Sequence, residues 1–315
     1  MKYGAIDIGT NSVRLLLAES EGHTIVKSKK YVTTTRLGSY INQDSIISEE
    51  GIEKTVEAIK EFGEKIEEYG CDKIYCIGTA ALRKSENRLE FKKMAKEVSG
   101  IDVEIIDGDR EAILGYRGVT GGVELDKDKC LIIDIGGGST EFIFGNSKEI
   151  YYKKSINIGA LLLTKKYITT MPEIEKEFVN LKNYIDSEVE KLYNEIRRSD
   201  MWVDSSDCQG IRLIGIGGTI TQTSAIHQKL EEYSREKVHL STVGIEDVSN
   251  QIKMISELNL EDRMKIKGIA PKRAEIILTG ELILKSIMEK FKFNEITVSE
   301  YDNLEGLVLE DISGR

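Results

Sequence analysis

The stretch AIDIGTNS at residues 5–12 decides the fold, because its plan returns as IIDIGGGST at residues 132–140. Each copy has an apolar strand that ends in Asp-Ile-Gly, then a small polar turn and a second apolar strand. The first copy predicts a hairpin with strands at Tyr3–Asp7 and Val13–Glu19. A repeated unit of this length exceeds the period of a solenoid, so the repeat indicates that a whole domain is duplicated.

Strands and helices alternate after the first copy, which indicates an α/β fold. One helix is predicted over 48–69 from its apolar spacing, with Ser48 as its N-terminal cap and Gly70 directly after its end. The same reading predicts helices over 89–99, 111–119, 178–198, 246–258, 273–291 and 303–311 and another from 220, and strands over 73–78, 102–106, 131–135, 212–216 and 295–299.

The best candidate for a domain boundary is Thr120–Val123, a Gly-rich stretch followed by the charged run 124–129. With 315 residues, the chain is long enough for two domains of roughly 150 residues each. Each copy of the repeat then opens one domain, and two such domains are expected to face each other across a cleft.

Charge and hydropathy exclude several classes of partner. The chain has 44 Lys and Arg against 54 Asp and Glu, a net charge of −10 that opposes non-specific attraction to nucleic acid or to an anionic membrane. Charged residues interrupt every apolar run before the roughly 18 residues of a membrane span, and Asp7 precludes a signal-peptide core at the N-terminus. We expect a soluble cytoplasmic protein without nucleic-acid or membrane partners.

Soft-metal and disulfide chemistry are not supported by the sequence. The four cysteines at 71, 76, 130 and 208 form no CxxC pair, and the three histidines at 23, 227 and 239 lack zinc-ligand spacing. Ordinary buried or half-buried thiols are therefore expected. Any metal should be a hard cation that is held by oxygen atoms.

Three loops are rich in Gly, Ser, Thr and Asn, at residues 9–12, 136–140 and 217–219. Glycines allow backbone N–H groups to approach an anion, hydroxyls add donors, and phosphate is the anion that such loops serve best. None of the loops matches the Walker pattern, and the first two lead into strands, which excludes a P-loop and a Rossmann fingerprint. A plain hairpin turn remains the alternative for any one loop.

Two aspartates, Asp7 and Asp134, stand where an apolar strand ends. A carboxylate at this edge of a sheet can hold Mg²⁺ beside a phosphate, or can simply bond to the backbone of its own turn. Glu111 follows a strand and reads either as a general base that deprotonates a water or as an acid that complements a helix dipole. Glu141 has the same ambiguity, and Arg83 reads as a phosphate fork or a surface charge.

Taken together, the motifs resemble one family. The chain is similar to the exopolyphosphatase/guanosine pentaphosphate phosphohydrolase (Ppx/GppA) family of the actin-like ATPase superfamily. The segments that carry the resemblance occur in the order of the family and run over nearly the whole chain, at residues 5–12, 78–83, 104–112, 133–141 and 215–219.

The resemblance implies two actin-like (ribonuclease H-like) domains, each a mixed sheet flanked by helices. Domain I would comprise 1–121 with about 301–315, and domain II would comprise 122–300, with no additional C-terminal helical domain. It also implies an enzyme that removes the terminal phosphate from a chain of phosphates with a divalent cation, usually Mg²⁺.

The resemblance further assigns roles by motif position. Glu111 looks like the catalytic base, while Asp134 and Glu141 look like the metal-binding and water-positioning acids. The residues that look like phosphate binders or close the site are Asp7, Gly9, Thr10, Asn11, Ser12, Arg83, Gly136, Gly137, Gly138, Ser139, Gly217, Gly218 and Thr219.

The chain also departs from the family at two positions. Leu304 stands where the family commonly has an Arg, and Leu162 where a basic residue is frequent. Both changes remove positive charge that a polyanion would contact, which argues against processive binding of very long chains. The end at Arg315 resembles the short two-domain members of the family.

We expect an exopolyphosphatase that releases phosphate from the end of inorganic polyphosphate, and the alternative is 5′-phosphate removal from guanosine pentaphosphate. A sugar-type kinase and a non-catalytic alarmone sensor also stay open. A basic patch that steers the anion has four candidates, Lys27, Lys29, Lys30 and Arg36, for which a solvated strand face is the other interpretation. Dimerisation is common in the family, so a homodimer is compatible with the sequence.

Overall fold

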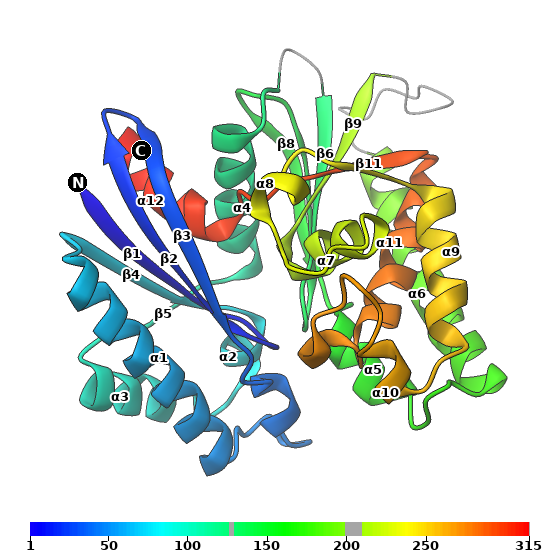
Figure 1. Cartoon of the computed structure of the whole chain (residues 1–315), viewed down its shortest axis with the longest axis horizontal. Coiled ribbons are helices and arrows are strands. Elements are labelled where there is room, and N and C mark those ends of the chain that lie inside the picture. Colours follow the sequence, from blue (N-terminus) through cyan, green and yellow to red (C-terminus); the bar gives the residue numbers. More distant parts are fainter. Residues whose placement is uncertain (126–128, 199–209, 315) are drawn as a thin grey trace. The chain divides into compact units, whose positions relative to one another are not determined.

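The computed structural model describes residues 1–125, 129–198 and 210–314, which divide into two compact units (Figure 1). Unit 1 comprises Met1–Gly122 with Tyr301–Arg315, and unit 2 comprises Val123–Glu300. Each unit is a mixed β-sheet flanked by helices, which confirms the predicted fold class. Cys208 lies outside the described residues, and so does the middle of the charged run 124–129.

Unit 1 is built on a five-stranded sheet with the order β3-β2-β1-β4-β5. Its strands are β1 Lys2–Ile8, β2 Val13–Glu21, β3 Thr24–Thr33, β4 Lys73–Gly78 and β5 Glu104–Ile105. Strands β1, β2 and β3 are antiparallel neighbours, whereas β4 and β5 continue from β1 in parallel. The predicted opening hairpin is confirmed, and β5 is shorter than the strand predicted at 102–106.

Two pairs of helices cover the two faces of this sheet. The helical segments of unit 1 are η1 Leu37–Tyr40, α1 Glu49–Tyr69, α2 Ala80–Lys84, α3 Arg88–Ser99, α4 Gly108–Gly122 and α12 Asn303–Ser313. Alternate residues of β1 point to opposite faces. Ile6 therefore packs in the cluster that contains Phe62 of α1, while Ala5 packs in the cluster that contains Leu304 of α12.

Helix α1 has the caps that its sequence predicts. The Ser48 hydroxyl accepts a hydrogen bond from the Gly51 N–H at 3.3 Å, which satisfies one donor of the first turn. Gly70 follows the helix with φ 71°, a left-handed conformation that favours glycine. The prediction of a helix between these two residues is confirmed.

Helix α4 begins three residues before the predicted start at Glu111 and continues through the predicted boundary. The Asp107 carboxylate accepts from the Arg110 N–H at 2.7 Å and so caps the helix, although Asp107-Gly108-Asp109 reads as a turn. Glycines at the other end let α12 and its preceding residues approach. A methyl group on Gly118 would lie 2.1 Å from the Asp302 carbonyl oxygen, and one on Gly122 would lie 2.2 Å from Tyr301 Cγ.

Unit 2 is built on a six-stranded sheet with the order β10-β11-β9-β6-β7-β8. Its strands are β6 Lys129–Ile135, β7 Thr140–Gly145, β8 Ile150–Ile156, β9 Ile211–Ile216, β10 Thr242–Gly244 and β11 Glu295–Val298. Strands β6, β7 and β8 are antiparallel neighbours, while β6, β9 and β11 run parallel. The second copy of the repeat is thus the hairpin β6–β7, equivalent to β1–β2 in unit 1.

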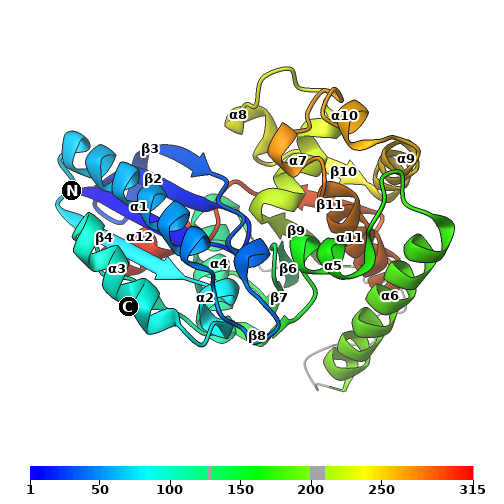
Figure 2. The same ribbon diagram turned by 90° about the horizontal axis from the view of Figure 1, so that it is seen from below.

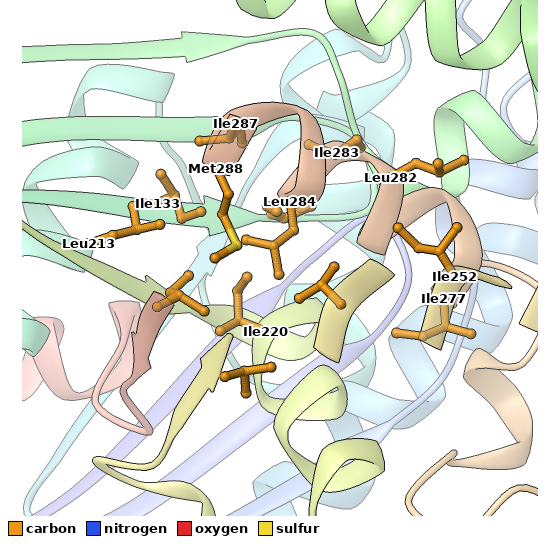
Figure 3. Packing of buried hydrophobic residues seen from close by; sticks show 14 of the residues in the cluster. Ile133, Leu213, Ile220, Ile252, Ile277, Leu282, Ile283, Leu284, Ile287 and Met288 are labelled. Carbon is orange, nitrogen blue, oxygen red and sulfur yellow. The ribbon is translucent and has the colours of Figure 1, made fainter. Parts of the chain in front are cut away.

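Helix α11 lies in the core of unit 2. The helical segments of this unit are α5 Ala160–Tyr167, α6 Glu175–Arg197, α7 Gly217–His227, α8 Arg235–Val238, α9 Ile245–Ser256, α10 Leu260–Arg263, η2 Pro271–Arg273 and α11 Ile277–Phe291. Figure 3 shows Leu284 and Met288 of α11 packed in one cluster with Leu213 of β9. Helix α6 lies beside α11 (Figure 2). Helix α11 begins at Ile277 and not at the predicted Arg273, which belongs to η2.

The length and apolar composition of the helices decide whether one of them could cross a membrane. Within residues 1–125, 129–198 and 210–314, none of the helices has both the length and the apolar composition that a bilayer crossing requires.

Candidate functional site

The predicted site residues of unit 1 follow three neighbouring parallel strands. Ile8 of β1 pairs with Gly78 of β4, and Gly78 pairs with Ile105 of β5, so the carboxyl ends of the three strands are aligned. The segments that leave this edge are the turn 9–12, the start of α2 with Arg83, and the start of α4 with Glu111. Ligands of open α/β sheets bind at such an edge.

The turn 9–12 is held by backbone hydrogen bonds. The Gly9 N–H donates to the Ser12 carbonyl at 3.0 Å, and the carbonyl oxygens of Thr10 and Asn11 accept from the backbone N–H groups of residues 38 and 36. Two buried side-chain oxygens at this turn, Asp7 Oδ1 and Asn11 Oδ1, have no hydrogen-bond partner. Both are acceptors, so they fit a donor such as an ordered water or a cation with its hydration shell, and not a bare phosphate oxygen.

Arg14 of β2 is a site residue that sequence reasoning missed. Its guanidinium pairs with Asp7, which lies directly opposite on β1, and also with Asp302 at 2.8 Å. Burial raises the pKa of Asp7, and Arg14 opposes this shift. Burial works in the same direction on Asp302, but Arg14 and Lys30 outweigh it and hold the pKa of that carboxyl below its ordinary value. The sequence feature that could have identified this residue is an arginine within the otherwise apolar first half of β2.

Arg83 and Glu111 lie in direct contact. The Nη1 atom of Arg83 donates to Glu111 Oε2 at 3.0 Å and to the Ile106 carbonyl oxygen at 2.9 Å. A guanidinium at this distance favours the ionised carboxylate, the form that a general base requires. Glu111 is buried and is the fourth residue of α4, so it lies in the first turn, where a carboxylate also complements the helix dipole.

The turn 136–139 of unit 2 repeats the geometry of the turn 9–12. The Gly136 N–H donates to the Ser139 carbonyl oxygen at 3.0 Å, as Gly9 does to Ser12. The start of α5 anchors the turn, because the N–H groups of Ala160 and Leu162 donate to the carbonyl oxygens of Gly136 and Gly137, each at 2.9 Å. The backbone of residue 162 therefore fixes this turn whatever its side chain is.

The two hairpins differ in charge at one equivalent position, which is Arg14 in the first hairpin and Glu141 in the second. Asp7 faces Arg14 across β1 and β2, whereas Asp134 faces Glu141 across β6 and β7. Like charges that lie directly opposite on neighbouring strands destabilise a sheet unless something compensates them. Mg²⁺ commonly binds through one or two carboxylates together with water and substrate oxygens, so the donor chemistry of Asp134 and Glu141 fits this cation.

No larger cluster of metal-ligand residues accompanies this pair. Within the part of the chain that the structure describes, no three His, Cys, Asp or Glu side chains are grouped so that they could hold a metal ion.

The described cysteines follow the prediction of ordinary thiols, because Cys76 and Cys130 are buried and Cys71 is half-buried. Burial raises the pKa of Cys130 to about 12 and keeps this thiol protonated.

Two hydroxyl groups hold Glu141. Ser139 Oγ and Ser155 Oγ each donate to Glu141 Oε1 at 2.7 Å. Ser139 belongs to the predicted site, but Ser155 lies on β8 and was not predicted, because nothing distinguishes it from other serines of an ordinary strand. Glu141 is only 2% exposed, so these contacts constrain a buried carboxylate.

The third predicted loop, 217–219, starts helix α7 and lies against Asp134. The predicted helix start at Ile220 is wrong, since α7 begins at Gly217. Asp134 pairs with Ile216 across the parallel strands β6 and β9, and the Thr219 hydroxyl donates to the Ile135 carbonyl at 2.8 Å. Gly217 has φ 79°, and a methyl group there would lie 2.1 Å from Asp134 Oδ1. Glycine is needed for both reasons.

Gly217→Ala should reduce kcat/KM by at least about tenfold, because the methyl group must displace the Asp134 carboxylate and a misplacement near 1 Å is enough for a large loss. The matched control is Gly210→Ala. Gly210 has φ 84° and no neighbouring atom within 4 Å, so it carries the same backbone strain of about 1–2 kcal/mol without the clash. Equal kinetic losses in the two variants would show that strain alone is responsible.

The two departures from the family pattern have different environments. Leu304 is fully buried in the apolar cluster of unit 1, whereas the Leu162 side chain is 39% exposed. Lys30 of β3 places a positive charge at the start of α12. Its Nζ lies 2.9 Å from Glu305 Oε2 and 3.0 Å from Asp302 Oδ2. These acids pair with Lys30, and its part in a steering patch stays a prediction.

A family model and several relatives match this chain. The model of the Ppx/GppA phosphatase family matches residues 15–314, which confirms the resemblance seen in the motifs. The chain is 36% identical over 327 aligned positions to a bifunctional 3-dehydroquinate synthase/phosphatase of Fusobacterium nucleatum. That alignment covers 99% of this chain and 46% of the relative, so the chain spans about half the length of this protein.

Other relatives are named for single activities. Exopolyphosphatase 2 of Mycobacterium tuberculosis is 27% identical over 98% of both chains. A guanosine-5′-triphosphate,3′-diphosphate pyrophosphatase of Photobacterium profundum is 26% identical over 99% of this chain and 59% of its own length. Among solved structures, an exopolyphosphatase of Cytophaga hutchinsonii superimposes with a TM-score of 0.87 at 28% identity, covering 100% of this chain and 98% of the other.

Proposed function

The chain belongs to the Ppx/GppA phosphatase family, and from this premise we propose that it hydrolyses the terminal phosphoanhydride bond of inorganic polyphosphate and releases phosphate. Two observations support this, one within each unit. In unit 1 the buried Glu111 pairs with Arg83, and in unit 2 the buried Asp134 lies directly opposite Glu141. The exopolyphosphatase relative of similar length supports the choice of substrate.

In this proposal Glu111 is the general base. A water oxygen forms a bond to the terminal phosphorus, the Glu111 carboxylate takes the water proton, and the bridging P–O bond breaks. The electron pair of that bond leaves with the shortened phosphate chain. Backbone N–H groups of the turns 9–12 and 136–139 and the Arg83 guanidinium bind the phosphate oxygens.

Asp134 and Glu141 are the residues that would hold Mg²⁺. When bound, this cation supplies positive charge that offsets the negative charge of the phosphate oxygens. Ser139 keeps the Glu141 carboxylate in place through its 2.7 Å hydrogen bond. The acidic balance of the chain makes such compensation necessary for any polyanionic substrate.

The second candidate is 5′-phosphate removal from guanosine pentaphosphate. The name of the Photobacterium profundum relative favours it. The attack on the terminal phosphorus and the role of Glu111 are the same in both reactions, and only the leaving group differs. The cytoplasmic location and the homodimer stay predictions.

Phosphate release from long-chain polyphosphate, tripolyphosphate, guanosine pentaphosphate and ATP tests the proposal. We expect the highest kcat/KM for a polyphosphate, whereas a preference for guanosine pentaphosphate would favour the second candidate. Transfer of phosphate to an added metabolite without release to water would contradict both and favour a kinase. Binding of guanosine pentaphosphate without any turnover would favour a sensor.

Removal of divalent cations by a chelator should abolish phosphate release, because two acids that lie directly opposite each other repel an anionic substrate unless a cation binds with it. Release should return on addition of Mg²⁺ in excess of the chelator. The measurement is the initial rate of phosphate release against free Mg²⁺ concentration. A rate that does not change over this titration would exclude the role proposed for the pair.

A further inference from the structure

Three side chains form a row across neighbouring antiparallel strands of unit 2. Asp134 of β6 pairs in register with Glu141 of β7, and Glu141 pairs in register with Ser155 of β8. Directly opposite residues of an antiparallel sheet point to the same face. The row therefore extends the two acids by one hydroxyl group, on the strand at the edge of the sheet.

Ser155 donates a hydrogen bond to the carboxylate of Glu141. A serine hydroxyl has one proton, and Ser155 donates it to Glu141 Oε1 at 2.7 Å, the oxygen that also accepts from Ser139 at 2.7 Å. Two hydroxyl donors on one carboxyl oxygen restrict the rotamers that this carboxylate can adopt. The two donors come from different places, the turn 136–139 and the edge strand β8.

We propose that Ser155 is a positioning residue, which holds the Glu141 carboxylate in one orientation from the edge strand β8. The inference rests on the proposed function for its kinetic consequence. The contact from Ser139 attaches the carboxylate to a turn of three glycines and one serine, whereas the contact from Ser155 attaches it to a paired strand.

A pair of variants with the same shape tests this role. Ser155→Thr keeps the hydroxyl, and Ser155→Val replaces it by a methyl group, while both residues suit a strand. We expect kcat to fall about tenfold in the Val variant with KM within about twofold of wild type, since displacement of a catalytic group acts on the chemical step. The Thr variant should retain kcat within about threefold. Equal kcat values in the two variants would overturn the role of the hydroxyl.

A second serine provides the control for loss of any hydroxyl from unit 2. Ser249 of α9 donates to the Ile245 carbonyl oxygen at 2.8 Å, a contact within its own helix. Ser249→Ala should leave both kcat and KM as in wild type. A tenfold loss of kcat in this control would show that the assay reports general damage to the unit, and the kinetic argument for Ser155 would fail.

Crystal structures of the two variants give a readout that does not depend on turnover. The Glu141 carboxylate should leave its position in the Val variant and keep it in the Thr variant. An unmoved Glu141 in the Val variant would overturn the inference even if the enzyme is active. If wild type releases no phosphate from any substrate, the proposed function fails, and these structures alone decide whether Ser155 positions Glu141.

Discussion

Glu111→Gln should lower kcat by about 10³-fold with a much smaller change in KM, which is the scale of effect expected when a general base is lost. Glutamine has the same shape and can still accept the hydrogen bond that Arg83 donates to Glu111 at 3.0 Å. It cannot take up the proton of the attacking water. Phosphate binding should persist, because the turns 9–12 and 136–139 and Arg83 are unchanged.

Steady-state phosphate release from polyphosphate gives kcat and KM, and equilibrium binding in the variant shows whether the substrate is still held. Asp109→Asn is the matched control. It makes the same kind of change in the first turn of α4, at an exposed residue. The role of Glu111 is excluded if Glu111→Gln retains a kcat within tenfold of wild type, or if Asp109→Asn loses as much.

Glu281→Gln should remove a pH dependence of stability that the structure indicates. Glu281 of α11 is fully buried in unit 2, and both of its carboxyl oxygens lack a hydrogen-bond partner. Burial raises the pKa of Glu281 to about 8, because the charged form is poorly solvated there. The carboxyl is therefore protonated in the folded protein at neutral pH.

The sign of the effect follows from the raised pKa. Below pH 4.5 the carboxyl is protonated in both the folded and the unfolded chain, and the stability associated with it is fully present. Between pH 4.5 and about 8 only the unfolded chain ionises, and wild type loses about 5 kcal/mol of its free energy of unfolding. The Gln variant does not ionise, so it should lack this slope and be the more stable protein at pH 9.

Urea unfolding of wild type and variant at pH 5 to 9 measures the difference directly. Glu257→Gln, which changes an exposed glutamate at the end of α9, serves as the control and should keep the slope of wild type. Parallel curves for wild type and Glu281→Gln would show that Glu281 is ionised in the folded protein or is compensated by another group.

The hairpins and the long helices were predictable because their signals are local. Asp-Ile-Gly between two apolar runs fixes a strand, a tight turn and a second strand, and the two turns close with the same 3.0 Å hydrogen bond. Helix α1 likewise has its cap, its apolar face and its terminal glycine within one continuous segment. Such elements depend on neighbours in sequence, so the pattern alone predicts them.

Helix starts at glycines were not predictable in the same way. Gly108 and Gly217 read as turn residues, yet α4 and α7 begin at them. In α4 the Asp107 side chain supplies a cap that outweighs the low helix propensity of glycine. In α7 the glycine is required by the Asp134 carboxylate, which lies on a strand more than eighty residues earlier. A local cap decided the first case, and a tertiary contact decided the second.

The residues that hold the site in place were also hidden from the sequence. Arg14 pairs with Asp302, which is separated from it by 288 positions and comes from the returning segment of unit 1. Ser155 and Glu281 occupy ordinary positions of a strand and a helix, and only the packing shows what surrounds them. The acids themselves were identified from motifs, whereas their partners required the structure.

The most direct test of the central claim is tripolyphosphate hydrolysis in ¹⁸O-labelled water with Mg²⁺, followed by mass analysis of both products. Water that attacks the terminal phosphorus places one ¹⁸O atom in the released phosphate and none in the pyrophosphate. The account predicts this distribution in wild type, and a fall of about 10³-fold in the rate at which labelled phosphate forms in Glu111→Gln. Label in the pyrophosphate, or unlabelled phosphate that appears only with an added acceptor, would contradict it.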